Sequence, residues 1–124
     1  MSDILLIHGS CHGAWCWRDL IPALEAFGHA PRAIDLPGHG ADKTPVNDVT
    51  LEGYADAILA ASTPDTVVLG HSMGGFAAIV LADFMEVDTV VSLAPQHSVH
   101  PDIAGNEHRW RNWVDPISDF RIRS

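Results

Sequence analysis

One serine in this sequence stands in a pattern that could support nucleophilic catalysis. Ser72 is the centre of Gly70-His71-Ser72-Met73-Gly74, a G-x-S-x-G motif that follows an aliphatic segment and opens an apolar one. A serine hydroxyl is a weak nucleophile, and a sharp turn from strand to helix can lift it to where a base and an ester carbonyl can reach it. The alternative without chemistry is a serine that only caps the following helix.

An acyl-transfer site also needs hydrogen-bond donors for the negative charge that develops on the carbonyl oxygen. The backbone N–H of Met73 would lie at the N-terminus of the helix after the motif, where the first amides have no partner within the helix. A second donor must come from another loop. Residues 8–15 follow the first predicted strand and contain glycines, which let a backbone approach a substrate closely. We therefore predict an oxyanion hole made by the N–H groups of Ser10 and Met73.

The elements that would position these residues alternate between strand and helix. Short aliphatic segments predict four buried strands, at residues 3–8, 30–35, 66–70 and 88–94. Apolar residues at helical spacing predict three helices, over residues 16–27, 51–61 (capped by Thr50) and 73–85. This alternation is typical of an α/β fold, a parallel sheet of about four strands with helices on both faces.

Composition limits the partners that we expect. The chain has 124 residues, of which 47% are hydrophobic and 19% charged, and this size suits one domain with a real core. A net charge of −9 disfavours nucleic acid and anionic membrane as ligands. No apolar run approaches the roughly 20 residues of a membrane helix. The start lacks the features of a secretion signal, so the expected location is the cytoplasm.

The charge is distributed unevenly along the chain. Residues 1–105 contain three basic and thirteen acidic residues, whereas residues 106–124 contain four arginines and three acidic residues. We therefore divide the chain into residues 1–105 and a divergent tail, residues 106–124, that could form a short helix. The two cysteines, Cys11 and Cys16, lack Cys-x-x-Cys spacing, so we expect free thiols and no metal site.

Three motifs resemble those of the α/β-hydrolase family, and they occur in that family's order. They are His-Gly-Ser-Cys-His-Gly-Ala-Trp-Cys-Trp at 8–17, Asp-Leu-Pro-Gly-His-Gly at 35–40 and Gly-His-Ser-Met-Gly-Gly at 70–75. The first is similar to the branch that contains plant methylesterases and hydroxynitrile lyases. The resemblance covers about residues 3–101, and it implies that residues 1–105 are the N-terminal part of an α/β-hydrolase domain. It implies that Ser72 is the nucleophile, that the amides of Ser10 and Met73 form the oxyanion hole, and that no cofactor is needed.

The same resemblance favours one chemistry over another. Hydroxynitrile lyases typically have a threonine after the first histidine of the first block, and this sequence has Gly9. We therefore expect hydrolysis of small, largely apolar carboxylic esters through an acyl-enzyme on Ser72. The competing hypothesis is a catalytically incomplete member that binds a small apolar ligand or a protein partner.

The acid and base of a catalytic triad are not evident in the sequence. The family's order is serine, then Asp or Glu, then histidine, and only one clear strand follows Ser72. His71 and His39 belong to the motifs, and we expect them to pack rather than to act. The candidates after the last predicted strand are His97, His100, Asp102 and His108. Their alternative role is a solvated loop.

A sheet that stops after four strands should leave an open edge. The strand at 88–94 is aliphatic and would lie at that edge. An exposed apolar edge pairs readily with another chain unless something covers it. Trp110 and Trp113 of the tail could supply such a cover. We predict self-association through this strand.

Overall fold

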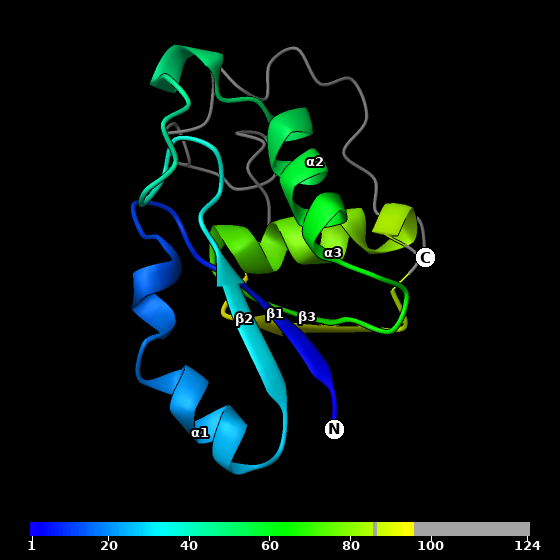
Figure 1. The fold of residues 1–124 in the computed structure, drawn as a ribbon. Helices are drawn as coiled ribbons and strands as arrows, with labels where there is room; N and C mark the ends of the chain where they lie inside the picture. The colour runs from blue at the N-terminus through cyan, green and yellow to red at the C-terminus, as the bar shows by residue number, and fades with distance from the viewer. Residues whose placement is uncertain (86, 96–124) are drawn as a thin grey trace.

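The structure is a computed structural model, and it describes residues 1–85 and 87–95. Figure 1 shows a single sheet with helices packed against it. The strands are β1 (Asp3–Ile7), β2 (Ala30–Ile34), β3 (Val67–His71) and β4 (Thr89–Leu93). The helices are α1 (Leu20–Ala26), α2 (Leu51–Ala61) and α3 (Met73–Met85), with 3₁₀ turns at Ala14–Trp17 and Val46–Asp48.

The four strands are all parallel and lie in the order β2-β1-β3-β4. Ile7 at the end of β1 pairs with Ile34 of β2 and with Gly70 of β3. Because the strands are parallel, the loops that leave their carboxyl ends meet at one edge of the sheet. Three segments therefore lie at the same edge, called the carboxyl edge below. They are the loop after β1 (residues 8–15, called the first loop), the loop that begins at Asp35 and the Ser72 motif.

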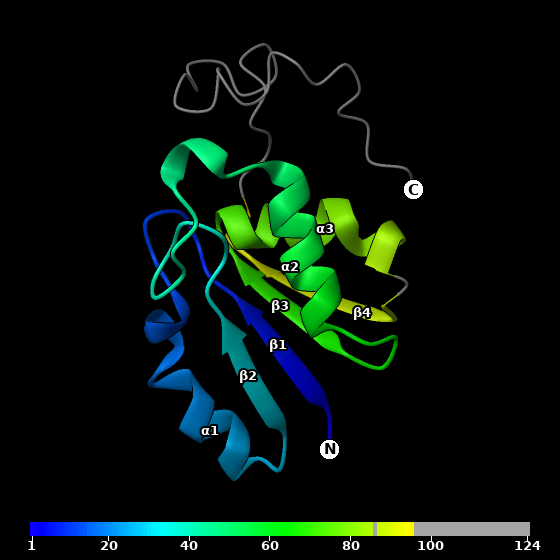
Figure 2. The ribbon, with the colours of Figure 1, turned by 45° about the horizontal axis from the view of Figure 1, so that its top comes forward.

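Helices cover both faces of the sheet, as the alternation in sequence predicted (Figure 2). Successive residues of a strand point to opposite faces. Leu5 and Ile7 pack with residues of α2 and α3, whereas Ile4 and Leu6 pack with Trp17 and with residues of α1. All four of these β1 side chains are buried, as expected for a central strand of a parallel sheet.

One predicted helix is divided in the structure. Residues 16–27 were expected to form a continuous helix, but the chain makes a 3₁₀ turn over Ala14–Trp17 and α1 begins only at Leu20. Pro22 explains the difference. Proline has no N–H to donate and its ring clashes with the carbonyl four residues earlier, so it is tolerated only in a first helical turn.

The other predicted elements are confirmed to within one residue of their ends. The hydroxyl oxygen of Thr50 accepts a hydrogen bond from the Gly53 N–H at 3.0 Å, which caps α2 as predicted. α3 begins immediately after Ser72 and packs on β3 and β4. Ala77 and Ala78 are buried there, and their small side chains let the helix lie close to the sheet.

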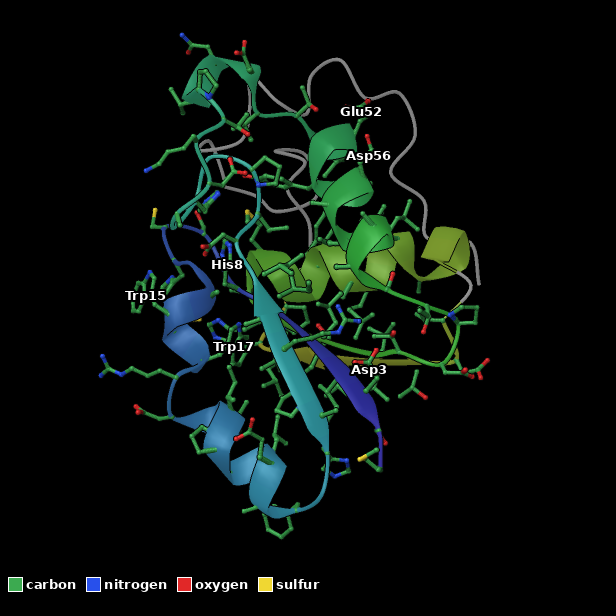
Figure 3. The ribbon with its side chains drawn as sticks, in the orientation of Figure 1. Asp3, His8, Trp15, Trp17, Glu52 and Asp56 are labelled. Atoms are coloured by element: carbon green, nitrogen blue, oxygen red, sulfur yellow. The ribbon has the colours of Figure 1, made fainter. Side chains whose placement is uncertain are left out.

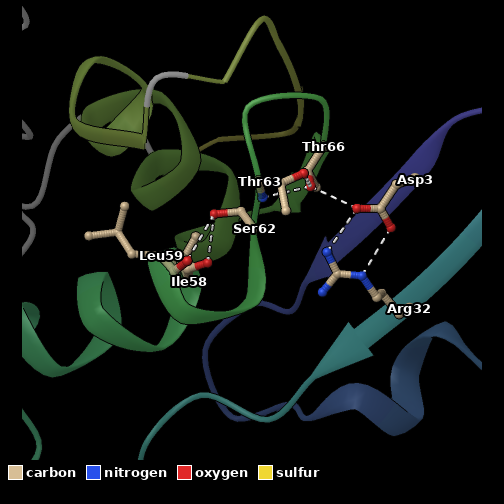
Figure 4. Close-up of polar contacts among 7 residues, drawn as sticks. All are labelled: Asp3, Arg32, Ile58, Leu59, Ser62, Thr63 and Thr66. Atoms are coloured by element: carbon tan, nitrogen blue, oxygen red, sulfur yellow. Dashed lines mark hydrogen bonds and ion pairs between the residues drawn. The ribbon is translucent and has the colours of Figure 1, made fainter.

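A polar network ties the amino ends of the strands together (Figure 4). The Asp3 carboxylate accepts hydrogen bonds from the Arg32 Nε and Nη2 at 3.0 and 2.9 Å, and from the Thr66 hydroxyl at 2.7 Å. These three residues come from β1, β2 and the turn before β3. The hydrogen bonds from Arg32 are the main reason that the pKa of Asp3 lies below its ordinary value.

Three further findings concern the sequence predictions. No helix in residues 1–85 and 87–95 is long and apolar enough to cross a membrane. Cys11 is exposed and Cys16 half-buried, and both are free thiols. The tail 106–124, with its expected helix and its tryptophans Trp110 and Trp113, lies outside the residues that the structure describes.

Candidate active site

Ser72 occupies a strained turn between β3 and α3. Its φ angle is 54°, in the left-handed region that residues other than glycine rarely adopt. Both of its backbone groups are bonded: the N–H donates to the Leu93 carbonyl at 3.0 Å, and the carbonyl accepts from the Phe76 N–H at 3.0 Å. The hydrogen bond to β4 and the first turn of α3 thus hold Ser72 in a conformation that costs of order 1–3 kcal/mol.

The motif glycines are required by close backbone packing around this turn. A Cβ on Gly70 would overlap the carbonyl of Gly74. A Cβ on Gly74 would lie 2.5 Å from the Ile7 carbonyl oxygen and even closer to that of His8. Since these neighbours are backbone atoms, they cannot move aside cheaply. The turn at Ser72, called the elbow below, therefore packs directly on the end of β1. A side chain at either glycine would push this turn away from the strand.

The predicted oxyanion donors belong to segments that meet at the carboxyl edge. Met73 is the first residue of α3, so its N–H precedes the first hydrogen bond within the helix. Gly9 passes directly beside the elbow, because a Cβ placed on it would lie 3.2 Å from the Ser72 Cβ. Ser10 is the next residue along this loop and is half-buried, as Ser72 is.

The first loop makes a tight turn over Ser10. The His12 N–H donates to the Gly9 carbonyl at 3.3 Å, and Cys11 between them has a φ of 61°. A positive φ at the third residue is typical of a type II turn. The His12 Nδ1 bonds the Ser10 carbonyl at 2.8 Å, and the His12 ring stacks on Trp15. The turn thus fixes both peptide groups of Ser10.

His8 is a buried residue whose structural role the sequence did not reveal. Its Nδ1 donates to the Gly9 carbonyl at 2.8 Å, and its Nε2 accepts from the Leu36 N–H at 3.1 Å. A ring that donates on one nitrogen and accepts on the other is neutral. Burial accordingly lowers the pKa of His8. Because both ring nitrogens are engaged, His8 is not a free base for Ser72.

Asp35 is a second residue whose part in the site the sequence did not reveal. It follows β2 directly, and its two carboxylate oxygens accept from different loops, Ala14 N–H at 2.7 Å and Ala41 N–H at 3.0 Å. These backbone donors, Ala41 first, lower the pKa of Asp35. The carboxylate is therefore ionised near neutral pH. It joins the first loop to the loop that contains Gly40.

Of the two motif histidines, His39 packs against other rings as expected, whereas His71 lies at the surface. His39 lies between the rings of His8 and Tyr54, with centroids 5.0 and 5.9 Å away. His71 is exposed, and its Nδ1 lies 3.3 Å from where a Cβ of Gly9 would be. The other candidates for acid and base, His97, His100, Asp102 and His108, lie outside the described residues. Within the described ranges, no three His, Cys, Asp or Glu side chains are grouped as metal ligands.

A strained serine between a parallel strand and a helix, with a glycine loop beside it, is the arrangement of a nucleophile elbow. The model of the alpha/beta hydrolase family matches residues 4–123. This chain belongs to the α/β-hydrolase family. The fold and the three sequence motifs agree with this membership, and the relatives specify the branch.

The relatives include plant methylesterases. Methylesterase 3 of Arabidopsis thaliana is 40% identical over 99 residues, which cover 74% of this chain and 38% of that protein. Methylesterase 1 of the same plant is 44% identical over 93 residues, covering 68% and 35%. The crystal structure of a methylesterase from Arabidopsis superposes with a TM-score of 0.68 at 28% identity, covering 79% of this chain and 45% of that one. The chain thus spans less than half the length of these relatives.

Proposed function

We propose that this chain carries the nucleophile and oxyanion hole of a serine hydrolase that acts on small, largely apolar carboxylic esters. The observation that supports it most directly is Ser72 at a φ of 54°, held between β3 and α3 beside the glycine loop. A residue in so costly a conformation is maintained where function requires it. Because the relatives include proteins named methylesterases, we propose methyl esters as the first substrates to consider.

The chemistry would proceed through an acyl-enzyme. The Ser72 Oγ attacks the ester carbonyl, and the N–H groups of Ser10 and Met73 stabilise the oxyanion of the tetrahedral intermediate. The C–O bond then breaks, the alcohol leaves with a proton, and water hydrolyses the acyl-serine. A base must take the serine proton and a carboxylate must orient it. Within this sequence, the candidates for the base and the carboxylate are His97, His100, Asp102 and His108. The other possible source of these groups is the remainder of a longer protein or a partner chain.

The proposal is tested by labelling the purified chain with a fluorophosphonate probe, which reacts with activated serines. The matched control is Ser72→Ala, which keeps the Cβ and removes only the hydroxyl. We expect rapid labelling that disappears in the variant. A folded chain that resists the probe would show that this chain alone is not an active hydrolase.

The second candidate function is a hydrolase fold that binds a small apolar ligand without hydrolysing it. It is favoured by the sequence, in which no histidine after Ser72 is clearly placed to act as its base. The two functions separate in one experiment. Binding of a methyl ester to the folded chain is measured by calorimetry, and the ester is then recovered. An ester that binds and is recovered unhydrolysed supports the function of ligand binding without hydrolysis.

We further propose that the chain self-associates through β4. Within the described residues β4 pairs only with β3, and its Val91 and Leu93 side chains are 37% and 43% exposed. An open aliphatic edge of this kind tends to pair with another strand. Sedimentation should show dimers or larger species that Val91→Lys reduces. A monomer at all concentrations would contradict this proposal.

A further inference from the structure

The first loop is the only part of the proposed oxyanion hole that lies outside the elbow, so something must hold it in place. Its near end is fixed where Gly9 passes beside Ser72 and where His8 bonds the Gly9 carbonyl. Its far end reaches Ala14, which begins a 3₁₀ turn whose N-cap residue, Gly13, has no side chain that could accept a hydrogen bond. The Ala14 N–H is instead held from outside, by the carboxylate of Asp35 at 2.7 Å.

The surroundings of Asp35 are shaped to receive a carboxylate. A Cβ on Gly13 would lie 2.8 Å from the Asp35 Oδ1, and a Cβ on Gly40 would overlap the carboxylate itself. The two glycines therefore leave the space that the carboxylate occupies between their loops. A carboxylate that accepts two backbone N–H groups makes stronger hydrogen bonds than a neutral acceptor would. Asp35 is thus a rigid link between the two loops.

We propose that Asp35 is a positioning residue for the oxyanion hole: by holding Ala14 it sets the path of the first loop and hence the place of the Ser10 N–H. This inference rests on the proposed function and deepens it, because it assigns a role to a side chain whose hydrogen bonds go to Ala14 and Ala41 rather than to Ser72. Misplacing an oxyanion donor by about 1 Å is enough to slow a reaction strongly.

A matched control exists in the same region. Asp42 also accepts from two backbone amides, Gly38 N–H and Thr44 N–H, both at 2.8 Å. Asp42 holds only its own loop and has no hydrogen bond to residues 9–14. Asp35→Ala and Asp42→Ala each remove a carboxylate that bonds two amides, but only the first should release the first loop.

The experiment measures amide hydrogen exchange and probe labelling in the full chain. Asp35→Ala should speed exchange across residues 9–14 and lower the maximal rate constant of fluorophosphonate labelling about tenfold or more, with the reversible binding constant of the probe unchanged. Asp42→Ala should speed exchange only in residues 37–44 and leave labelling unchanged. Asp35→Asn, which keeps one acceptor, should fall between Asp35→Ala and the unmodified chain.

Gly13→Ala gives an independent test if Asp35→Ala fails to fold. The φ of Gly13 is −161°, which an alanine adopts easily. Its added methyl would crowd the Asp35 Oδ1 at 2.8 Å, and also the Trp15 Cδ1 at 2.9 Å and the Gly40 Cα at 3.0 Å. It should therefore reproduce the effects of Asp35→Ala. Unchanged exchange at residues 9–14 in Asp35→Asn and Gly13→Ala would overturn the proposal. If the unmodified chain resists the probe, the hydrolase proposal fails, and the exchange measurements still decide whether Asp35 positions the loop.

Discussion

The two edges of the sheet are built on different principles, and Figure 3 shows them at the opposite ends of β1, at Asp3 and at His8. At the amino edge, the side chains of Asp3, Arg32 and Thr66 join three segments directly, and the Thr66 hydroxyl also accepts from the Thr63 N–H. At the carboxyl edge, His8 and Asp35 bond the backbone amides of loops. The first arrangement stabilises strands, whereas the second also sets the course of the loops.

Backbone strain is distributed in the same way. In the described residues, the residues other than glycine with positive φ are Cys11, Ser72 and Ala94, and each lies in a loop that leaves the carboxyl end of a strand. The carboxyl edge therefore holds its loops in costly conformations, and the amino edge does not. Strain that gathers where a site is proposed is the pattern expected when a fold stabilises residues for function.

The largest effect should come from crowding the elbow. We expect Gly74→Ala to lower the free energy of unfolding by about 3 kcal/mol or more, because the new Cβ would meet backbone carbonyls of Ile7 and His8 that cannot move cheaply. Chemical denaturation of each variant measures this free energy of unfolding. The control is Gly28→Ala, at a φ of +84° with open space around it, which should cost only about 1 kcal/mol. Equal losses for both variants would contradict this account of the elbow.

A smaller effect should reveal the strain at Ser72. Glycine accepts a positive φ freely, so Ser72→Gly should be more stable than Ser72→Ala by about 1 kcal/mol. Ser62, after α2, provides the matched pair, because its φ of −112° gives glycine no advantage. There the glycine variant should be less stable than the alanine variant by about 0.5–1 kcal/mol. The same sign at both positions would mean that Ser72 is not strained.

The smallest effects should appear as pH dependence, and the two edges should respond in different ranges. Burial lowers the pKa of His8, so the unfolded chain binds more protons between that lowered value and about 6.5, and stability falls as the pH drops through this range. Hydrogen bonds from Arg32 lower the pKa of Asp3, so its contribution is present above pH 3.8 and is lost only at lower pH.

Denaturation from pH 8 to pH 3 checks both edges. His8→Gln should flatten the slope just below pH 6.5. Asp3→Asn should flatten only the most acidic part. Because Asp3 and Arg32 are about one third exposed, solvent screens their ion pair and keeps the effect small. If Asp3→Asn removed the pH dependence of stability near pH 6.5, this dependence could not be assigned to His8 at the carboxyl edge.

Much of the fold could be predicted because its signals are local. The aliphatic runs gave the strands, and Thr50 marked the start of α2. The error over residues 16–27 came from counting apolar spacing without the effect of Pro22. Ser72 could be found because a nucleophile elbow is a short, contiguous pattern. His8 and Asp35 could not be assigned roles, since their partners are backbone groups that any residue could supply.

The sequence by itself determined the alternation of strands and helices and the chemistry that Ser72 could perform, because apolar periodicity, caps and a five-residue motif act over short stretches of chain. Only the tertiary structure decided which segments meet. It placed Gly9 against Ser72, Asp35 beneath the first loop, and Asp3 beside Thr66, a residue 63 positions away. Contacts of this kind depend on the parallel order β2-β1-β3-β4, because this order fixes the neighbours of each strand. No short sequence pattern encodes it.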